Sequence, residues 1–90
     1  MINKQVEFEL SRPVAPGESI VDALRYLEMS PETLAQETHE SVDYVKAVLK
    51  GKTPITLRFA QRLEPILKVP ADFWLRYDKQ YQRLQQEAVE

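Results

Sequence analysis

The chain is short of the residues that build catalytic and metal sites. Its 90 residues include no cysteine, one histidine and two glycines. Without cysteine, neither a disulfide framework nor a thiolate zinc site can form. The single histidine, His39, has no second histidine or cysteine with which to complete a metal site or a nucleophile and base pair, and two glycines are too few for a glycine-rich phosphate loop. The sequence therefore predicts no enzyme, no cofactor and no bound metal.

Long apolar runs are missing as well. No run approaches the roughly 20 residues that span a membrane, and the N-terminus lacks the basic and then apolar layout of a signal peptide. A chain of 90 residues suffices for one domain with one modest core. We therefore expect a soluble cytoplasmic protein with one domain over residues 13–90, preceded by an arm over residues 1–12.

Within this arm, apolar residues alternate with acidic ones at Val6, Phe8 and Leu10. A period of two predicts a short extended strand. Such a strand either lies across the helices or adds to the edge of a partner's sheet. A terminal arm without a function of its own is the simpler alternative.

Charge is distributed unevenly along the chain. The formal net charge of −2 argues mildly against nucleic-acid binding, because the neutralisation of phosphates supplies most of that affinity. Residues 1–43 hold nine acidic and three basic residues, whereas residues 44–63 hold five basic residues and no acidic one. The five basic residues are Lys46, Lys50, Lys52, Arg58 and Arg62. A one-sided basic patch is typical of nucleic-acid binders, although lysines scattered on a solvated helix face are an alternative.

The segment 29–51 carries the signals of two short helices that meet at a tight corner. Ser30 can cap a helix that begins at Pro31, and Ser41 can cap a second helix that Gly51 ends. Three polar residues interrupt the apolar rhythm between the two helices: Thr38, His39 and Glu40. Two short helices joined by a three-residue turn match the helix-turn-helix unit, whose second helix enters a DNA major groove.

Three further helices are expected around this motif. The first covers residues 17–29, the fourth follows a cap at Thr56, and the last begins at about Ala71. Pro65 lies inside the fourth helix and is expected to kink or split it. The apolar positions predicted to face inward are Ile20, Val21, Leu24, Leu27, Phe59, Ala60, Leu63 and Leu67.

The last helix carries apolar residues at alternating spacings of three and four. They are Trp74, Tyr77, Tyr81, Leu84 and Ala88. This heptad-like seam extends beyond what so small a domain can cover, which favours a homodimer with the first four residues in the interface. The first two turns, with Phe73 and Trp74, are expected to pack on the chain's own core. Because only two heptads are present, a frayed amphipathic tail is the alternative.

The second helix of the motif would present one face to DNA. If Val45, Val48 and Leu49 point into the core, the opposite face holds residues that can contact base edges. Residues in the following loop and at helix starts are better placed for phosphates. The predicted DNA contacts are Thr33, Ser41, Val42, Asp43, Tyr44, Lys46, Ala47, Lys50, Lys52, Thr53, Thr56 and Arg58. Asp43 has a second explanation, since a carboxylate in the first helical turn is favoured by the helix dipole.

Several motifs resemble those of one known family. They are PGE at residues 16–18, LA at 34–35, SVDYVKAVLKG at 41–51, GKTPIT at 51–56 and the FWL of PADFWL at 70–75. The sequence resembles the lambda-repressor-like (XRE/Cro) helix-turn-helix domains, and among them the HigA-type antitoxins. This resemblance implies an all-α, five-helix DNA-binding domain, a homodimer on a palindromic operator in double-stranded DNA, repression of its own operon and a toxin partner.

The sequence departs from the family pattern at three positions. His39 stands where the family usually has glycine, Glu40 replaces a small apolar residue, and Pro31 replaces a polar residue at the start of a helix. We expect these changes to alter the turn and to affect DNA binding more than the fold. The alternative functions are a protein-interaction module, in which the helix-turn-helix is mainly scaffold, and a regulator of a mobile element.

Overall fold

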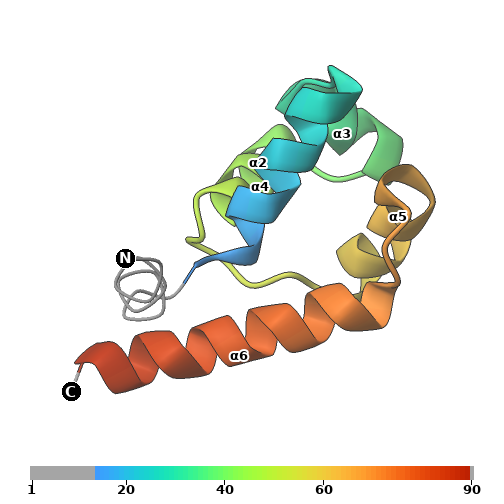
Figure 1. Cartoon of the computed structure of the whole chain (residues 1–90). Helices are drawn as coiled ribbons and strands as arrows, with labels where there is room; N and C mark the ends of the chain where they lie inside the picture. Colours follow the sequence, from blue (N-terminus) through green and yellow to red (C-terminus); the bar gives the residue numbers. More distant parts are fainter. Residues whose placement is uncertain (1–13, 90) are drawn as a thin grey trace, which may run out of the picture.

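The computed structural model describes residues 14–89, and within them it contains five helices and no strand. The helices are α2 (Pro16–Leu27), α3 (Pro31–Thr38), α4 (Val42–Leu49), α5 (Leu57–Leu67) and α6 (Ala71–Val89) (Figure 1). The expected all-α fold with five helices is confirmed. The predicted arm and its strand lie outside the described residues.

Each of the three predicted helix caps is present. The side-chain oxygens of Ser30, Ser41 and Thr56 each accept a hydrogen bond from the backbone N–H three residues later, at 3.0–3.1 Å. These bonds satisfy N–H groups that a helix start leaves without a partner, and each contributes about 1 kcal/mol. The starts of α3, α4 and α5 are therefore determined by local sequence.

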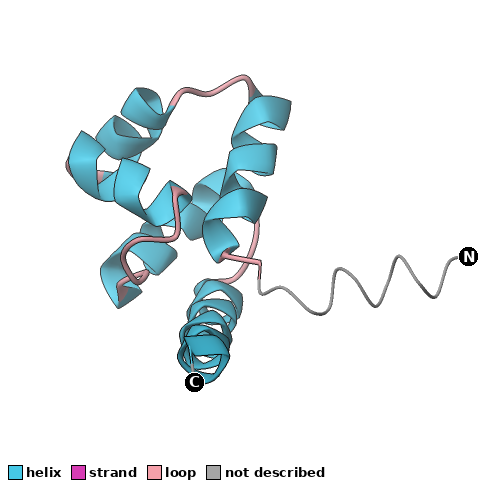
Figure 2. Cartoon of the chain, turned by 90° about the vertical axis from the view of Figure 1, so that its left-hand side faces the viewer, coloured by secondary structure: helices cyan, strands magenta, loops and turns pink. Residues whose placement is uncertain are grey.

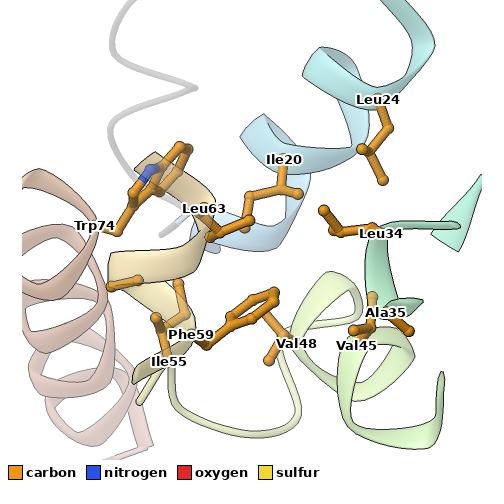
Figure 3. Packing of buried hydrophobic residues seen from close by; sticks show 11 residues of the cluster. Ile20, Leu24, Leu34, Ala35, Val45, Val48, Ile55, Phe59, Leu63 and Trp74 are labelled. Carbon is orange, nitrogen blue, oxygen red and sulfur yellow. The ribbon is translucent and has the colours of Figure 1, made fainter. Parts of the chain in front are cut away.

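The core is one cluster to which all five helices contribute. Phe59 of α5 lies within it, fully buried, with Ile20 of α2 and Leu34 of α3 (Figure 3). Val45 and Val48 enter from α4, so the buried face of that helix is as predicted. Burying each side chain of this size contributes roughly 1.5–3 kcal/mol. This cluster fixes how α3 and α4 sit against α5.

Helix α6 is the longest element and lies along one side of the other helices (Figure 1); it is seen nearly end-on in Figure 2. It packs against α5 and α2. Trp74 reaches from α6 into the common core and is 3% exposed. Helix α6 is thus part of the domain rather than an appended tail.

The corner between α3 and α4 is formed by residues 39–41, one position later than predicted. Thr38 is not in the turn: it is the last residue of α3, is fully buried, and donates its hydroxyl to the carbonyl of Leu34 at 2.7 Å. Because the Thr38 hydroxyl forms this hydrogen bond within α3, the polar side chain can occupy a core position. His39 then adopts the left-handed conformation at a φ of 58°.

The altered turn that we expected from His39 and Glu40 is absent. The N–H of Glu40 donates to the carbonyl of Ala35 at 2.9 Å, and the N–H of His39 donates to that of Gln36 at 3.3 Å. These two bonds are those of a Schellman motif, the usual helix end with glycine in the left-handed position. The backbone geometry is retained with histidine in place of glycine.

Replacing His39 with glycine is expected to stabilise the domain by about 0.5–1 kcal/mol. A residue with a side chain pays about 1–2 kcal/mol in the left-handed region, and glycine removes this strain at an entropic cost of about 0.5–1 kcal/mol. His39 is exposed, so few contacts are lost. Urea unfolding of the two proteins measures the difference, and a less stable glycine variant would show that the imidazole makes a stabilising contact.

Two other parts of the helix predictions are wrong, namely the inward position of Leu27 and a split of α5 at Pro65. Leu27 is 42% exposed rather than inward, because α2 ends at this residue and the chain turns away. Helix α5 is not split but continues through Pro65 to Leu67. The carbonyl that Pro65 leaves without a helical partner belongs to Gln61, an exposed residue, so water can satisfy it.

Candidate nucleic-acid interface

The face of α4 opposite the core carries polar and basic side chains. Asp43, Lys46 and Lys50 are exposed, and Ala47 beside them is half-buried. Val42 is also half-buried, but it packs against the core at the edge of this face. All five were predicted to contact DNA. The outer face combines two amino donors, one carboxylate acceptor and one small apolar group, which are chemical types that read base edges in a major groove.

Two of the predicted phosphate contacts lie where α3 and α4 begin. Thr33 is exposed in the first turn of α3, where the Ser30 hydroxyl donates to its Oγ1 atom at 3.0 Å. Ser41 is exposed at the start of α4. Both positions are close to helix N-termini, whose free N–H groups and positive dipole end favour anions such as phosphate.

The loop of residues 51–56 is attached to α4 by Tyr44. The Tyr44 hydroxyl donates to the carbonyl of Pro54 and accepts from the N–H of Thr56, both at 3.0 Å. Its ring packs edge to face on Phe59, with the centroids 5.3 Å apart. Tyr44 was predicted to contact DNA, but its hydroxyl already has a donor and an acceptor within the chain. Its observed role is to hold the loop that carries Lys52 and Thr53.

The same loop is attached to α6 by Asp78, a residue that no sequence motif singles out. Asp78 is 7% exposed, and its carboxylate accepts the N–H of Ile55 at 3.2 Å. The sequence did offer one signal for Asp78: an acidic residue four positions after Trp74 lies on the inward face of α6, where it needs a hydrogen-bond partner. With Tyr44 on one side and Asp78 on the other, the loop is fixed between α4 and α6.

Three of the five basic residues in residues 44–63 have partners within the chain. Lys46 Nζ lies 3.3 Å from a carboxylate oxygen of Glu32, and Arg58 Nε lies 3.4 Å from one of Glu40. Arg62 donates to the carbonyl of Thr38 at 2.8 Å and thereby caps the end of α3. The other two, Lys50 and Lys52, are exposed and form no ion pair within the described part of the chain.

The remaining phosphate candidates are exposed or half-buried next to this surface. Lys52 and Arg58 are exposed and Thr53 is half-buried. Thr56 is exposed, but its hydroxyl oxygen caps α5. The structure therefore brings the predicted contacts of α4 together with those of the following loop, while Tyr44 and Thr56 have structural roles there.

The pKa of Glu32 is lowered from its ordinary value of 4.5, first by a hydrogen bond from its own backbone N–H and then by Lys46. A lowered folded-state pKa means that this group stabilises the fold above its unfolded pKa and ceases to do so as the pH falls through the folded pKa. We expect Lys46→Met to raise the Glu32 pKa only part of the way to 4.5, since the backbone bond remains. An NMR pH titration of the Glu32 carboxyl checks this, and complete return to 4.5 would contradict it.

The predicted dimer seam on α6 is divided between two faces. Trp74 belongs to the core, and Tyr81 is half-buried with its hydroxyl close to Gly51, so these two pack on their own chain. Tyr77 and Leu84 are half-buried. Phe73, expected in the core, is 45% exposed and meets Tyr77 edge to face at 5.8 Å. The reason is helical geometry, because positions 73, 77 and 84 share one side of the helix while 74 and 78 share another.

Residues 14–89 contain neither a candidate metal site nor a candidate membrane-spanning helix. No cluster of three or more histidine, cysteine or acidic side chains there could hold a metal ion. None of the described helices combines the length and apolar character needed to cross a membrane.

Known structures resemble this chain over most of its length. An addiction module antidote protein of the HigA family from Coxiella burnetii is 33% identical, with 79% of this chain and 78% of that chain covered and a TM-score of 0.74. The antitoxin HigA of Pseudomonas aeruginosa, solved with the higBA promoter, is 28% identical with 87% and 86% covered and a TM-score of 0.80. A P. aeruginosa protein in complex with its operator DNA is 28% identical with 88% and 86% covered and a TM-score of 0.79.

No protein-family model and no curated protein matches the chain. The Coxiella protein nevertheless is 33% identical to this chain over an alignment that covers more than two thirds of both, and the helix-turn-helix predicted from the sequence is present. The chain belongs to the HigA family of addiction module antidote proteins.

Proposed function

We propose that this protein is a sequence-specific DNA-binding repressor that acts as an antitoxin and controls its own operon. The observation that carries the proposal is the exposed face of α4, set in a fold shared with two proteins solved on promoter or operator DNA. Membership of an antidote family supports the antitoxin role. A toxin would then be the protein partner.

In the proposed complex α4 lies in the major groove. Lys46 and Lys50 can donate to guanine O6 and N7, Asp43 can accept from cytosine N4, and the apolar groups of Val42 and Ala47 can meet thymine methyls. Thr33, Ser41, Lys52, Thr53 and Arg58 supply phosphate contacts that fix the position of α4 without reading sequence. Whether or not Asp43 contacts a cytosine, its carboxylate in the first turn of α4 interacts favourably with the helix dipole.

We further propose a homodimer that places two α4 helices on a palindromic operator. The support is the side of α6 on which Phe73 is exposed and the half-buried Tyr77 and Leu84 lie in line with it. Sedimentation analysis should show a dimer, and Phe73→Glu combined with Leu84→Glu should shift it toward monomer. A wild-type monomer at micromolar concentration would contradict this part of the proposal.

The DNA-binding proposal is tested by fluorescence anisotropy with the DNA upstream of the gene and a shuffled duplex of equal length. We expect the upstream DNA to bind at least about a thousandfold more tightly, as specific sites do relative to other DNA. Asp43→Ala should lower this ratio if Asp43 reads a cytosine. Equal affinity for the two duplexes at every salt concentration would refute the proposal.

The second candidate function is a protein-interaction module that uses the helix-turn-helix as a scaffold. One observation favours it: Lys46 and Arg58 are already paired with acidic residues of their own chain. Co-purification of the neighbouring gene's product, unaffected by Lys46→Glu and Lys50→Glu and accompanied by no DNA binding, would favour this candidate over the repressor.

A further inference from the structure

Two acidic residues form ion pairs with basic residues of the candidate DNA surface. Glu32, in the first turn of α3, approaches Lys46 of α4 to 3.3 Å, and Glu40, in the turn, approaches Arg58 of α5 to 3.4 Å. Both pairs join separate helices or a helix and the turn, so neither follows from residue spacing within one helix. From the sequence, both cations were predicted to contact DNA.

We propose that Glu32 and Glu40 are built-in counterions that weaken the attraction of Lys46 and Arg58 to the phosphates of non-operator DNA, and thereby raise discrimination in favour of the operator. The inference rests on the proposed function, because it concerns how that DNA surface selects its target. It assigns a specificity role to two acidic residues that point toward the cations rather than toward bases.

The physical basis is the difference between non-specific and specific binding. Non-specific affinity comes almost entirely from cations that replace the counterions of phosphates, so a cation with an internal partner contributes less to it. A carboxylate beside the cation also repels each phosphate that approaches. Operator binding is affected less, because a lysine or arginine that is already held in place loses less side-chain freedom when it meets its base or phosphate in the operator complex.

The two acidic residues are suited to this role in different ways. Only 12% of the Glu40 side chain is exposed, so its carboxylate has little freedom to leave Arg58. Glu32 is 58% exposed and lies in the first turn of α3, with its carboxylate 3.3 Å from Lys46 Nζ. Its pKa is lowered, so it stays negatively charged at neutral pH. One counterion is therefore largely buried, and the other is exposed at a helix start.

The test measures affinity and its salt dependence for Glu32→Gln and Glu40→Gln on a shuffled duplex and on the upstream DNA. Each substitution should raise affinity for the shuffled duplex about threefold to tenfold at low salt. The slope of log K against log salt should steepen by about one for each cation released. Affinity for the upstream DNA should change by less than about twofold, so the ratio between the two DNAs falls.

Two controls separate release of a cation from a mere change of net charge. Glu37→Gln removes the same charge from α3, and Glu37 is exposed and forms no ion pair within the described residues, so the slope of this variant should match that of the wild type. Lys46→Met should abolish the effect of Glu32→Gln in a double-mutant cycle. Glutamine keeps the size of glutamate, and thermal unfolding confirms that each variant is folded.

The counterion role is overturned if Glu32→Gln and Glu40→Gln leave the slope on the shuffled duplex unchanged, or if the gain persists without Lys46. For a wild-type protein that prefers the upstream DNA, it is also overturned if the substitutions raise affinity for both DNAs equally. Failure of the repressor proposal is a separate result, namely a wild-type protein that binds both DNAs equally. If the wild type binds both DNAs equally, the slopes of log K against log salt on the shuffled duplex still test whether Glu32 and Glu40 act as counterions.

Discussion

Gly17→Ala is expected to destabilise the domain by about 3 kcal/mol or more, although it adds only one methyl group. A Cβ atom at Gly17 would lie 2.3 Å from the carbonyl oxygen of Val48 and 2.5 Å from that of Leu49. Both are backbone atoms at the end of α4, so rotation of a side chain cannot relieve the clash. Helix α2 would have to move away from α4 and give up part of the core.

Thermal unfolding followed by circular dichroism measures this effect. For a domain of this size, about 3 kcal/mol corresponds to a fall in Tm of roughly 12–24 °C. Gly51→Ala is the matched control, because its Cβ would meet side-chain atoms at 3.0 and 3.3 Å but would be strained by a φ of 74°. It should cost about 1–2 kcal/mol. If Gly17→Ala proved no more destabilising than Gly51→Ala, the close approach of α2 to α4 would be wrong.

Replacing both Lys50 and Lys52 with glutamate is expected to weaken DNA binding about a hundredfold at 0.1 M salt. These lysines are exposed and carry no internal partner among the described residues, so their full charge is available to phosphates or bases. Each phosphate contact contributes about eightfold at this salt concentration, and reversal of the charge adds repulsion. The salt slope should become shallower by about two.

The matched control is reversal of two other exposed lysines, Lys68 and Lys79, which lie outside α4 and its loop. It changes the net charge by the same amount, so its smaller effect measures the long-range contribution alone. We expect a loss of less than about fivefold and an unchanged slope. Equal losses in the two double variants would mean that the α4 surface is not the one that contacts DNA.

The sequence predicted those features that depend on neighbouring residues. Ser30, Ser41 and Thr56 were identified as caps because a cap acts on an N–H only three residues away. Gly51 was identified as a helix end for the same reason, and it adopts the left-handed conformation. The inward faces of α4 and α5 follow from helical periodicity. Local signals of this kind were enough to locate the helix-turn-helix.

Contacts between distant residues could not be predicted in this way. Tyr44 bonds to residues ten and twelve positions away, and Asp78 bonds to Ile55 across 23 positions. Periodicity says which side of a helix a residue is on but not which backbone group it will meet there. The bonds from Tyr44 to the loop were therefore not predicted, and Asp78 was not assigned to the site.

The ion pairs of the candidate surface were missed for a related reason. Charge counting placed Lys46 and Arg58 in a basic segment and Glu32 and Glu40 in an acidic one, although the fold brings each base to an acid. The boundary at residue 43 separates an acidic from a basic segment of the sequence, but it does not separate acidic from basic regions of the folded surface. The net positive charge of the candidate surface is consequently smaller than the count implies and depends most on Lys50 and Lys52.

An NMR titration of isotope-labelled protein with the upstream duplex tests the central claim most directly. We predict that the largest amide shift changes fall at the starts of α3 and α4, along α4 and in the loop of residues 51–56. The shuffled duplex should give weaker and more uniform changes. Shift changes centred on the outward side of α6, or equal changes with both duplexes, would contradict the assignment of α4 and its loop as a sequence-specific DNA-binding surface.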